Sequence, residues 1–131
     1  MMTRNECARW LLSRDNFCIL THLRPDGDTI GSSAALCLGL RQLGKTAHVL
    51  YNPEITEKYK SLHQGLSKPE AEEGDTLVSV DIASAALLPQ NAKPLLERIA
   101  LRIDHHFSAT SFTPEAHHSR LITHGSSACH Y

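Results

Sequence analysis

The chain has 131 residues, of which 41% are hydrophobic and 21% are charged, and its formal net charge is −1. This length accommodates one domain with a hydrophobic core. The absence of a Lys- or Arg-rich block argues against tight binding to long duplex nucleic acid, and no apolar run is long enough for a membrane span. Because there is no signal-peptide pattern and no C-x-x-C pair among the four cysteines, we expect a cytoplasmic protein with reduced thiols.

Expected helices and strands alternate along the chain. Thr3 and Glu6 have the spacing of a capping box at the start of a helix. The apolar run 17–21 predicts a buried strand, and the Ala- and Leu-rich stretch 29–43, followed by Gly44, predicts a helix. The remaining expected elements are strands at 46–51, 76–81 and 100–104 and a short helix around 57–63. This alternation predicts an α/β fold, with a parallel, doubly wound sheet and helices on both faces.

Most of the aspartates follow predicted strands. Asp26 and Asp28 come after the first strand, Asp81 ends the third, and Asp104 ends the fourth. Ligands of open parallel sheets bind outside the carboxyl ends of the strands, so we expect these side chains to converge at one edge of the sheet. Histidines lie beside them in the sequence. The candidate site consists of His22, Asp26, Asp28, Asp81, His105 and His106, with Asp104 next to the last two.

This mixture of carboxylate oxygens and imidazole nitrogens indicates a metal site. It suits Mn²⁺ or a similar divalent ion, such as Mg²⁺ or Co²⁺, better than a closed structural zinc site. Several carboxylates can be placed together only if cations offset their repulsion. The number of ligands favours two ions ~3.5–4 Å apart that share a carboxylate, an arrangement used to hydrolyse phosphate esters. No other cofactor is expected.

Each segment also has an ordinary structural interpretation when it is taken alone. The sequence "PDGD" is typical of a turn, and Asp81 could cap a helix. A single "DHH" is a weak signal. The metal site is favoured because the three segments follow three different strands of the same expected sheet.

The sequences "HLRPDGDTIGS", "VSVD" and "IDHH" occur in that order on the expected strands. They resemble the first three motifs of the DHH phosphoesterases, and the resemblance extends from about Phe17 to Tyr131. The form "PDGD-x-x-GS" is more similar to the branch that degrades very short oligoribonucleotides and 3′-phosphoadenosine-5′-phosphate than to the inorganic pyrophosphatases. The resemblance implies Mn²⁺-dependent, two-metal hydrolysis of phosphate esters. The implied partner is a short single-stranded oligonucleotide or a small phosphorylated nucleotide, and a homodimer is possible.

The resemblance also implies a role for each metal ligand. His22 and Asp26 would hold one Mn²⁺, and Asp28 and His105 would hold the other. Asp81 would bridge the two ions.

Two further residues are expected to be catalytic by the same resemblance. His106 would face the substrate phosphate, and Asp104 would orient the histidines by accepting a hydrogen bond. The fourth acidic motif of the family and its C-terminal substrate-binding domain have no counterpart here. We therefore expect residues 1–131 to be the N-terminal part of a larger DHH enzyme, with reduced activity on its own. The alternatives are an inorganic pyrophosphatase of the same superfamily and a non-catalytic metal- or nucleotide-binding fragment.

Overall fold

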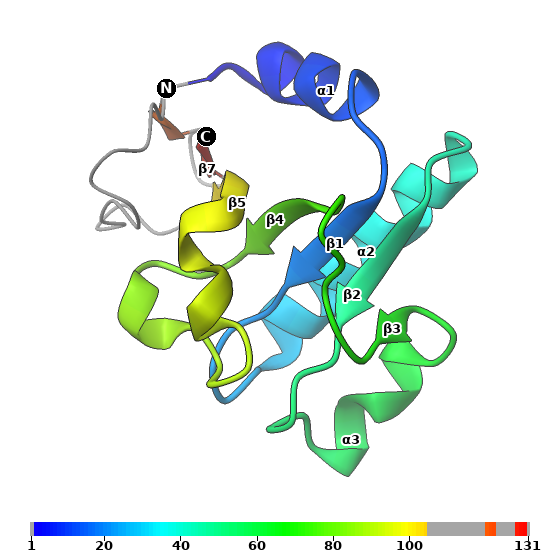
Figure 1. Cartoon of the computed structure of the whole chain (residues 1–131), viewed down its shortest axis with the longest axis vertical. Coiled ribbons are helices and arrows are strands. Elements are labelled where there is room, and N and C mark those ends of the chain that lie inside the picture. Colours follow the sequence, from blue (N-terminus) through cyan, green and yellow to red (C-terminus); the bar gives the residue numbers. More distant parts are fainter. Residues whose placement is uncertain (1, 105–119, 123–127, 131) are drawn as a thin grey trace.

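The computed structural model describes residues 2–104, 120–122 and 128–130. Within these residues the strands form one sheet (Figure 1). They are β1 Phe17–Leu20, β2 Ala47–Leu50, β3 Ser67–Lys68, β4 Thr76–Val80, β5 Ile99–Asp104, β6 Arg120–Ile122 and β7 Ala128–His130. Their order across the sheet is β3-β2-β1-β4-β5-β7-β6. The five strands from β3 to β5 are parallel, which confirms the expected parallel α/β sheet.

Side-chain caps mark the starts of the two longest helices. The helical segments are α1 Arg4–Leu12, α2 Gly27–Gln42, α3 Glu57–Lys60, and the 3₁₀ segments η1 Ser61–His63, η2 Ala85–Leu87 and η3 Lys93–Arg98. The expected capping box at α1 is present, since the Thr3 side chain accepts from the Glu6 N–H and the Glu6 carboxylate accepts from the Thr3 N–H. Helix α2 begins two residues before the expected position because Asp26 caps it.

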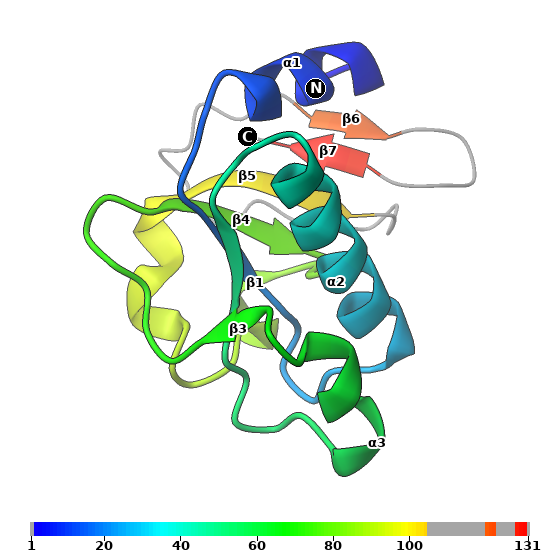
Figure 2. The same cartoon turned by 90° about the vertical axis from the view of Figure 1, so that its right-hand side faces the viewer.

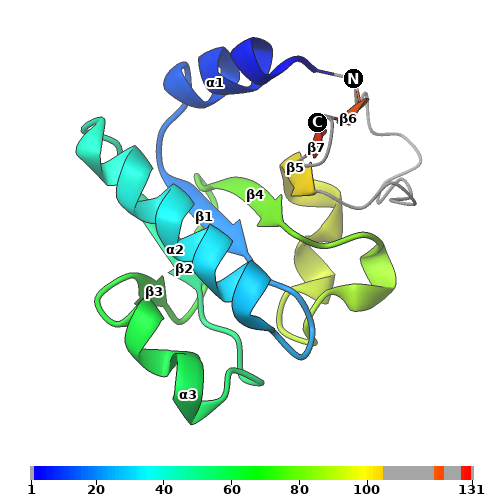
Figure 3. The same ribbon diagram turned by 180° about the vertical axis from the view of Figure 1, so that it is seen from behind.

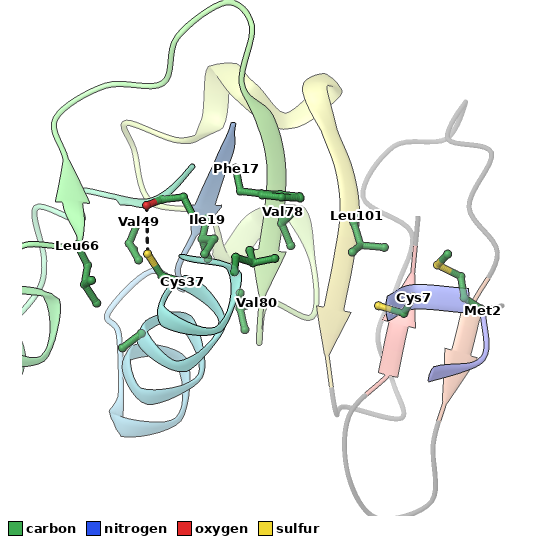
Figure 4. Packing of buried hydrophobic residues seen from close by; sticks show 13 residues of the cluster. Met2, Cys7, Phe17, Ile19, Cys37, Val49, Leu66, Val78, Val80 and Leu101 are labelled. Carbon is green, nitrogen blue, oxygen red and sulfur yellow. Dashed lines mark hydrogen bonds between the residues drawn. The ribbon is translucent and has the colours of Figure 1, made fainter. Parts of the chain in front are cut away.

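Helical segments cover both faces of the sheet. Figures 2 and 3 show α2 lying along one face, where its residue Cys37 packs with Ile19, Val49 and Val78 in the larger hydrophobic cluster (Figure 4). The segments η2 and η3 belong to the opposite side, where a second cluster includes Leu88 and other buried apolar residues. Prolines in the connection between β4 and β5 disfavour a continuous α-helix, and this connection forms short 3₁₀ turns instead.

Two parts of the sheet were not expected from the sequence. Strand β3 pairs in parallel with β2 through the registers Val49↔Ser67 and Leu50↔Lys68. On the other side of the sheet, β7 pairs antiparallel with β5, and β6 pairs antiparallel with β7. The described sheet is therefore parallel over five strands and continues into an antiparallel pair.

The cysteines do not all behave as expected. Cys18 and Cys37 are buried free thiols, and burial raises the pKa of Cys18 to about 12. Cys37 donates a hydrogen bond from Sγ to the Ala47 carbonyl, at 3.4 Å (dashed in Figure 4). Cys7 is disulfide-bonded, so the expectation of fully reduced cysteines is wrong for this residue. In the part of the chain that the structure describes, no helix has the length and hydropathy needed to cross a membrane.

Candidate metal centre

Three of the expected metal ligands come together beside α2. Asp26, Asp28 and Asp81 each offer a carboxylate oxygen, and these oxygens all lie within 4.8 Å of one another. Asp26 is the N-cap of α2 and Asp28 lies in its first turn, whereas Asp81 directly follows β4. The first two side chains are exposed and Asp81 is buried. The sheet topology therefore brings together acidic residues from two distant segments, as expected.

The backbone of Asp81 has an unusual conformation. Its φ is +60°, in the left-handed region that costs most L-residues about 1–2 kcal/mol and that Asp, Asn and Gly tolerate best. The Asp81 N–H donates a hydrogen bond to the Ile103 carbonyl at 2.8 Å, which continues the pairing of β4 with β5 by one residue. Unfavourable backbone conformations of this kind are concentrated at functional sites. The chain turns at Asp81, at the end of β4, and the Asp81 carboxylate lies close to those of Asp26 and Asp28.

Thr29 connects the segments that carry the acidic residues. Its hydroxyl donates to the Val80 carbonyl at 3.1 Å and accepts from the His22 N–H at 3.2 Å. Its backbone N–H donates to Asp26 Oδ1 at 3.0 Å. Thr29 is completely buried, and its bond to the Val80 carbonyl lies in the interior, where water does not compete for it. No sequence motif marks Thr29, although its position three residues after Asp26 is the usual one for the bond between a backbone N–H and a capping carboxylate.

His22 lies on the loop between β1 and α2 and is half-buried, but it does not belong to the carboxylate group. Its Nδ1 forms a hydrogen bond with the Leu23 carbonyl. With Nδ1 engaged by this carbonyl, Nε2 is the ring nitrogen that remains available to a metal ion. The His22 carbonyl accepts from Asn52 Nδ2 at 2.8 Å, which fixes this loop to the residues after β2.

Asp104 is buried at the carboxyl end of β5, on the strand next to the one that leads into Asp81. His105 and His106 lie outside the described residues, so their expected roles as metal ligand and substrate-facing residue stay predictions.

The electrostatics of the three carboxylates favour a divalent cation. Mutual repulsion opposes their approach, and the positive end of the α2 dipole offsets only part of it. Oxygen ligands of this type suit Mn²⁺ and Mg²⁺, and both are compatible with an added imidazole such as His22. The residues present therefore fit a divalent metal ion.

Comparisons with known proteins identify relatives of this chain. Residues 16–130 match the family model described as DHH family, N-terminal domain. The bifunctional oligoribonuclease and PAP phosphatase NrnA of Thermus thermophilus is 34% identical to this chain over 90 residues. The aligned segment covers 67% of this chain and 27% of that relative, so the chain spans only part of the relative's length. The matched region includes all of the residues assigned to the candidate site.

Proposed function

The chain belongs to the DHH family, and we propose on this premise that it contributes the metal-binding part of a phosphoesterase acting on very short oligoribonucleotides or 3′-phosphoadenosine-5′-phosphate. The observation that carries the proposal is the convergence of Asp26, Asp28 and Asp81, with their oxygens within 4.8 Å. The name of the Thermus relative, which includes both activities, supports this choice of substrate class.

In this proposal each acidic residue contributes to holding two Mn²⁺ ions. Asp81 would contribute to both ions, Asp26 and His22 would complete one site, and Asp28 and His105 would contribute to the other. When bound, the ions supply an activated water and stabilise charge that develops on the phosphate. Mg²⁺ or Co²⁺ could occupy the same ligands.

Two neighbouring residues have roles that do not depend on direct metal binding. We assign His106 to the substrate phosphate and His105 to the metal, because adjacent residues after a strand project in different directions and would not both reach the same ion. We assign Asp104, which is buried at the end of β5, to orienting the histidines as a hydrogen-bond acceptor. The homodimer, the cytoplasmic location and the assignment of residues 1–131 to one part of a larger enzyme stay predictions.

The metal assignment is tested most directly with Asp81→Asn. Asn tolerates the left-handed conformation that Asp81 adopts, so this substitution removes the charge with little backbone cost. We expect the affinity for Mn²⁺, measured by calorimetric titration, to fall at least about tenfold, which corresponds to about 1.4 kcal/mol. The far-ultraviolet circular dichroism spectrum should not change.

Glu97→Gln is the matched control, because it also converts a carboxylate to an amide and Glu97 is exposed on η3. This variant should bind Mn²⁺ as the original chain does. Equal Mn²⁺ affinity in Asp81→Asn and Glu97→Gln would contradict the assignment.

The substrate class is tested by comparing hydrolysis of three compounds in Mn²⁺: a ribodinucleotide, 3′-phosphoadenosine-5′-phosphate and inorganic pyrophosphate. Faster hydrolysis of either nucleotide supports the proposed branch. A preference for pyrophosphate would favour the alternative branch of the superfamily.

A further inference from the structure

A cavity of about 570 Å³ lies beside the candidate metal centre and contains none of the residues assigned to it. It is bounded by the residues that follow β2, by α3 and η1, and by the start of β3. The lining residues that matter here are Tyr51, Asn52, Lys60, Ser61, His63 and Gln64. Small-molecule sites commonly have volumes of roughly 300–1,000 Å³, so the cavity can hold a ligand of nucleoside size.

On the β2 side, a residue of the cavity wall is hydrogen-bonded to the loop that carries His22. Asn52 is buried, and its side-chain amide donates to the His22 carbonyl at 2.8 Å and to Thr21 Oγ1 at 3.0 Å. Asn52 therefore contacts both the cavity and the loop that carries His22. A ligand in the cavity would lie next to this loop.

A second connection runs through α2. The ring of His63 places Nε2 2.9 Å from Ser33 Oγ and 3.3 Å from the Ile30 carbonyl, both on the helix that Asp26 caps. In Figure 1, α3 lies beyond the carboxyl ends of β1 and β2, the edge that also carries the acidic residues. The cavity and the three carboxylates thus share one edge of the sheet.

The charges of the lining favour an uncharged ligand group. Lys60 Nζ lies 2.8 Å from Glu57 Oε1, and both residues line the cavity, so their charges compensate each other. Burial lowers the pKa of His63, which keeps this imidazole neutral at pH 7. The lining residues therefore present no uncompensated positive charge that would attract a phosphate group of the ligand.

The remaining lining groups suit a base and a ribose. Tyr51 is 45% exposed and offers an aromatic ring on which a base can stack. Gln64 and Ser61 are exposed and provide an amide and a hydroxyl that both donate and accept hydrogen bonds. These are the groups that read the edges of unpaired bases and ribose hydroxyls.

We propose that this cavity binds the uncharged nucleoside portion of a nucleotide whose phosphate lies at the three carboxylates. The position of the phosphate rests on the proposed function, whereas the binding of the nucleoside rests on the cavity itself. The cavity then selects nucleotides over simple phosphate esters.

The test is a titration of the full chain with adenosine in metal-free buffer, followed by amide chemical shifts and calorimetry. We expect saturable binding, with shifts at Ser61 and Gln64. The variant Ser61→Trp should weaken binding at least tenfold because Ser61 lines the cavity and the indole takes up space that the ligand needs. The control Gln42→Trp places the same side chain at the exposed far end of α2 and should leave the affinity unchanged.

A second pair of variants keeps the cavity open. Tyr51→Leu should weaken adenosine binding at least fivefold, and Tyr51→Phe should retain it. Inorganic phosphate should not compete with adenosine. Absence of saturable binding, equal binding by Ser61→Trp and Gln42→Trp, or competition by phosphate would overturn the proposal.

The same titrations separate this proposal from the proposed function. Asp81→Asn should lose Mn²⁺ binding and keep adenosine binding. If the original chain binds Mn²⁺ but not adenosine, the cavity proposal fails and the metal assignment stands. If it binds adenosine but not Mn²⁺, the proposed function fails and the nucleoside site stands.

Discussion

At the scale of single residues, the candidate metal centre depends on a few buried hydrogen bonds. The Thr29 hydroxyl is shared between the His22 N–H and the Val80 carbonyl, and it therefore couples the loop after β1 to the end of β4. Asp81 is the residue after Val80, and its backbone N–H donates a hydrogen bond to the Ile103 carbonyl. Small displacements of either segment would change the separation of the carboxylates.

We predict that Thr29→Val weakens both folding and metal binding. Valine has nearly the same shape but leaves the Val80 carbonyl and the His22 N–H unsatisfied in a buried place, which costs about 1–3 kcal/mol. The free energy of unfolding, measured in urea, should fall by that amount. The Mn²⁺ affinity should fall several-fold as the two loops lose their connection.

Thr29→Ser is the matched control, because serine keeps the hydroxyl and should restore most of the Mn²⁺ affinity. If Thr29→Val were destabilised but bound Mn²⁺ with unchanged affinity while folded, Thr29 would support the fold without positioning the metal ligands.

At the scale of secondary-structure elements, the contact between η1 and α2 shapes the nucleoside-sized cavity. His63 is 5% exposed and bonds across this contact to Ser33 and Ile30. Because α3 and η1 are short, they depend on such tertiary contacts for their position. His63 is also the titratable group in this contact.

We predict a pH-dependent loss of stability that originates at His63. Burial lowers its pKa in the folded chain, so the unfolded chain takes up a proton first as the pH falls. The contribution of His63 to the free energy of unfolding is therefore fully present above about pH 6.5. It decreases below that pH until the pKa of the folded state is reached.

The measurement is urea unfolding at pH 8 and pH 5 for the original chain and for His63→Gln, which cannot titrate. The variant should show a smaller difference in unfolding free energy between the two pH values. An equal difference in the two proteins would show that His63 does not contribute to the pH dependence.

At the scale of the whole molecule, a parallel sheet with two apolar faces supports functional groups along one edge. The clusters on the two faces fix β1, β2 and β4 relative to one another. The polar loops after these strands can then carry charged residues without disturbing the core. A metal ion bound at this edge would connect α2 to β4 and stabilise the folded chain as a whole.

We predict that Mn²⁺ raises the melting temperature of the chain. At a free Mn²⁺ concentration 100 times the dissociation constant, linkage stabilises the folded state by about 2.7 kcal/mol. For 131 residues this corresponds to an increase of roughly 10 °C. Differential scanning calorimetry should show this increase for the original chain and for Glu97→Gln.

Asp81→Asn should show little or no increase at the same Mn²⁺ concentration. A Mn²⁺-dependent increase of equal size in that variant would mean that the ion binds elsewhere on the chain.

Much of this architecture could be predicted because it is encoded locally. Apolar runs predicted the parallel strands β1, β2, β4 and β5, and the capping box of Thr3 and Glu6 predicted the start of α1. The convergence of Asp26, Asp28 and Asp81 followed from the rule that parallel strands present their carboxyl ends at one edge. These features need only the sequence pattern and the sheet topology.

Other features depend on tertiary contacts that have no local pattern. Strand β3 is two residues long and lacks apolar alternation, and its pairing depends on backbone bonds such as that from the Tyr51 N–H to the Lys68 carbonyl. The bond from Thr29 reaches Val80, 51 positions along the chain. The left-handed conformation of Asp81 and the cavity near η1 were equally inaccessible to pattern analysis.

The backbone conformation of Asp81 also has a genetic consequence. A single base change converts an Asp codon into one for Asn or Gly, and these are the residues best able to adopt its φ of +60°. Such alleles would produce a folded, abundant protein that has lost the carboxylate. A deep mutational scan scored by protein abundance would rank position 81 as tolerant of both changes, whereas a scan scored by Mn²⁺-dependent activity would rank it as intolerant.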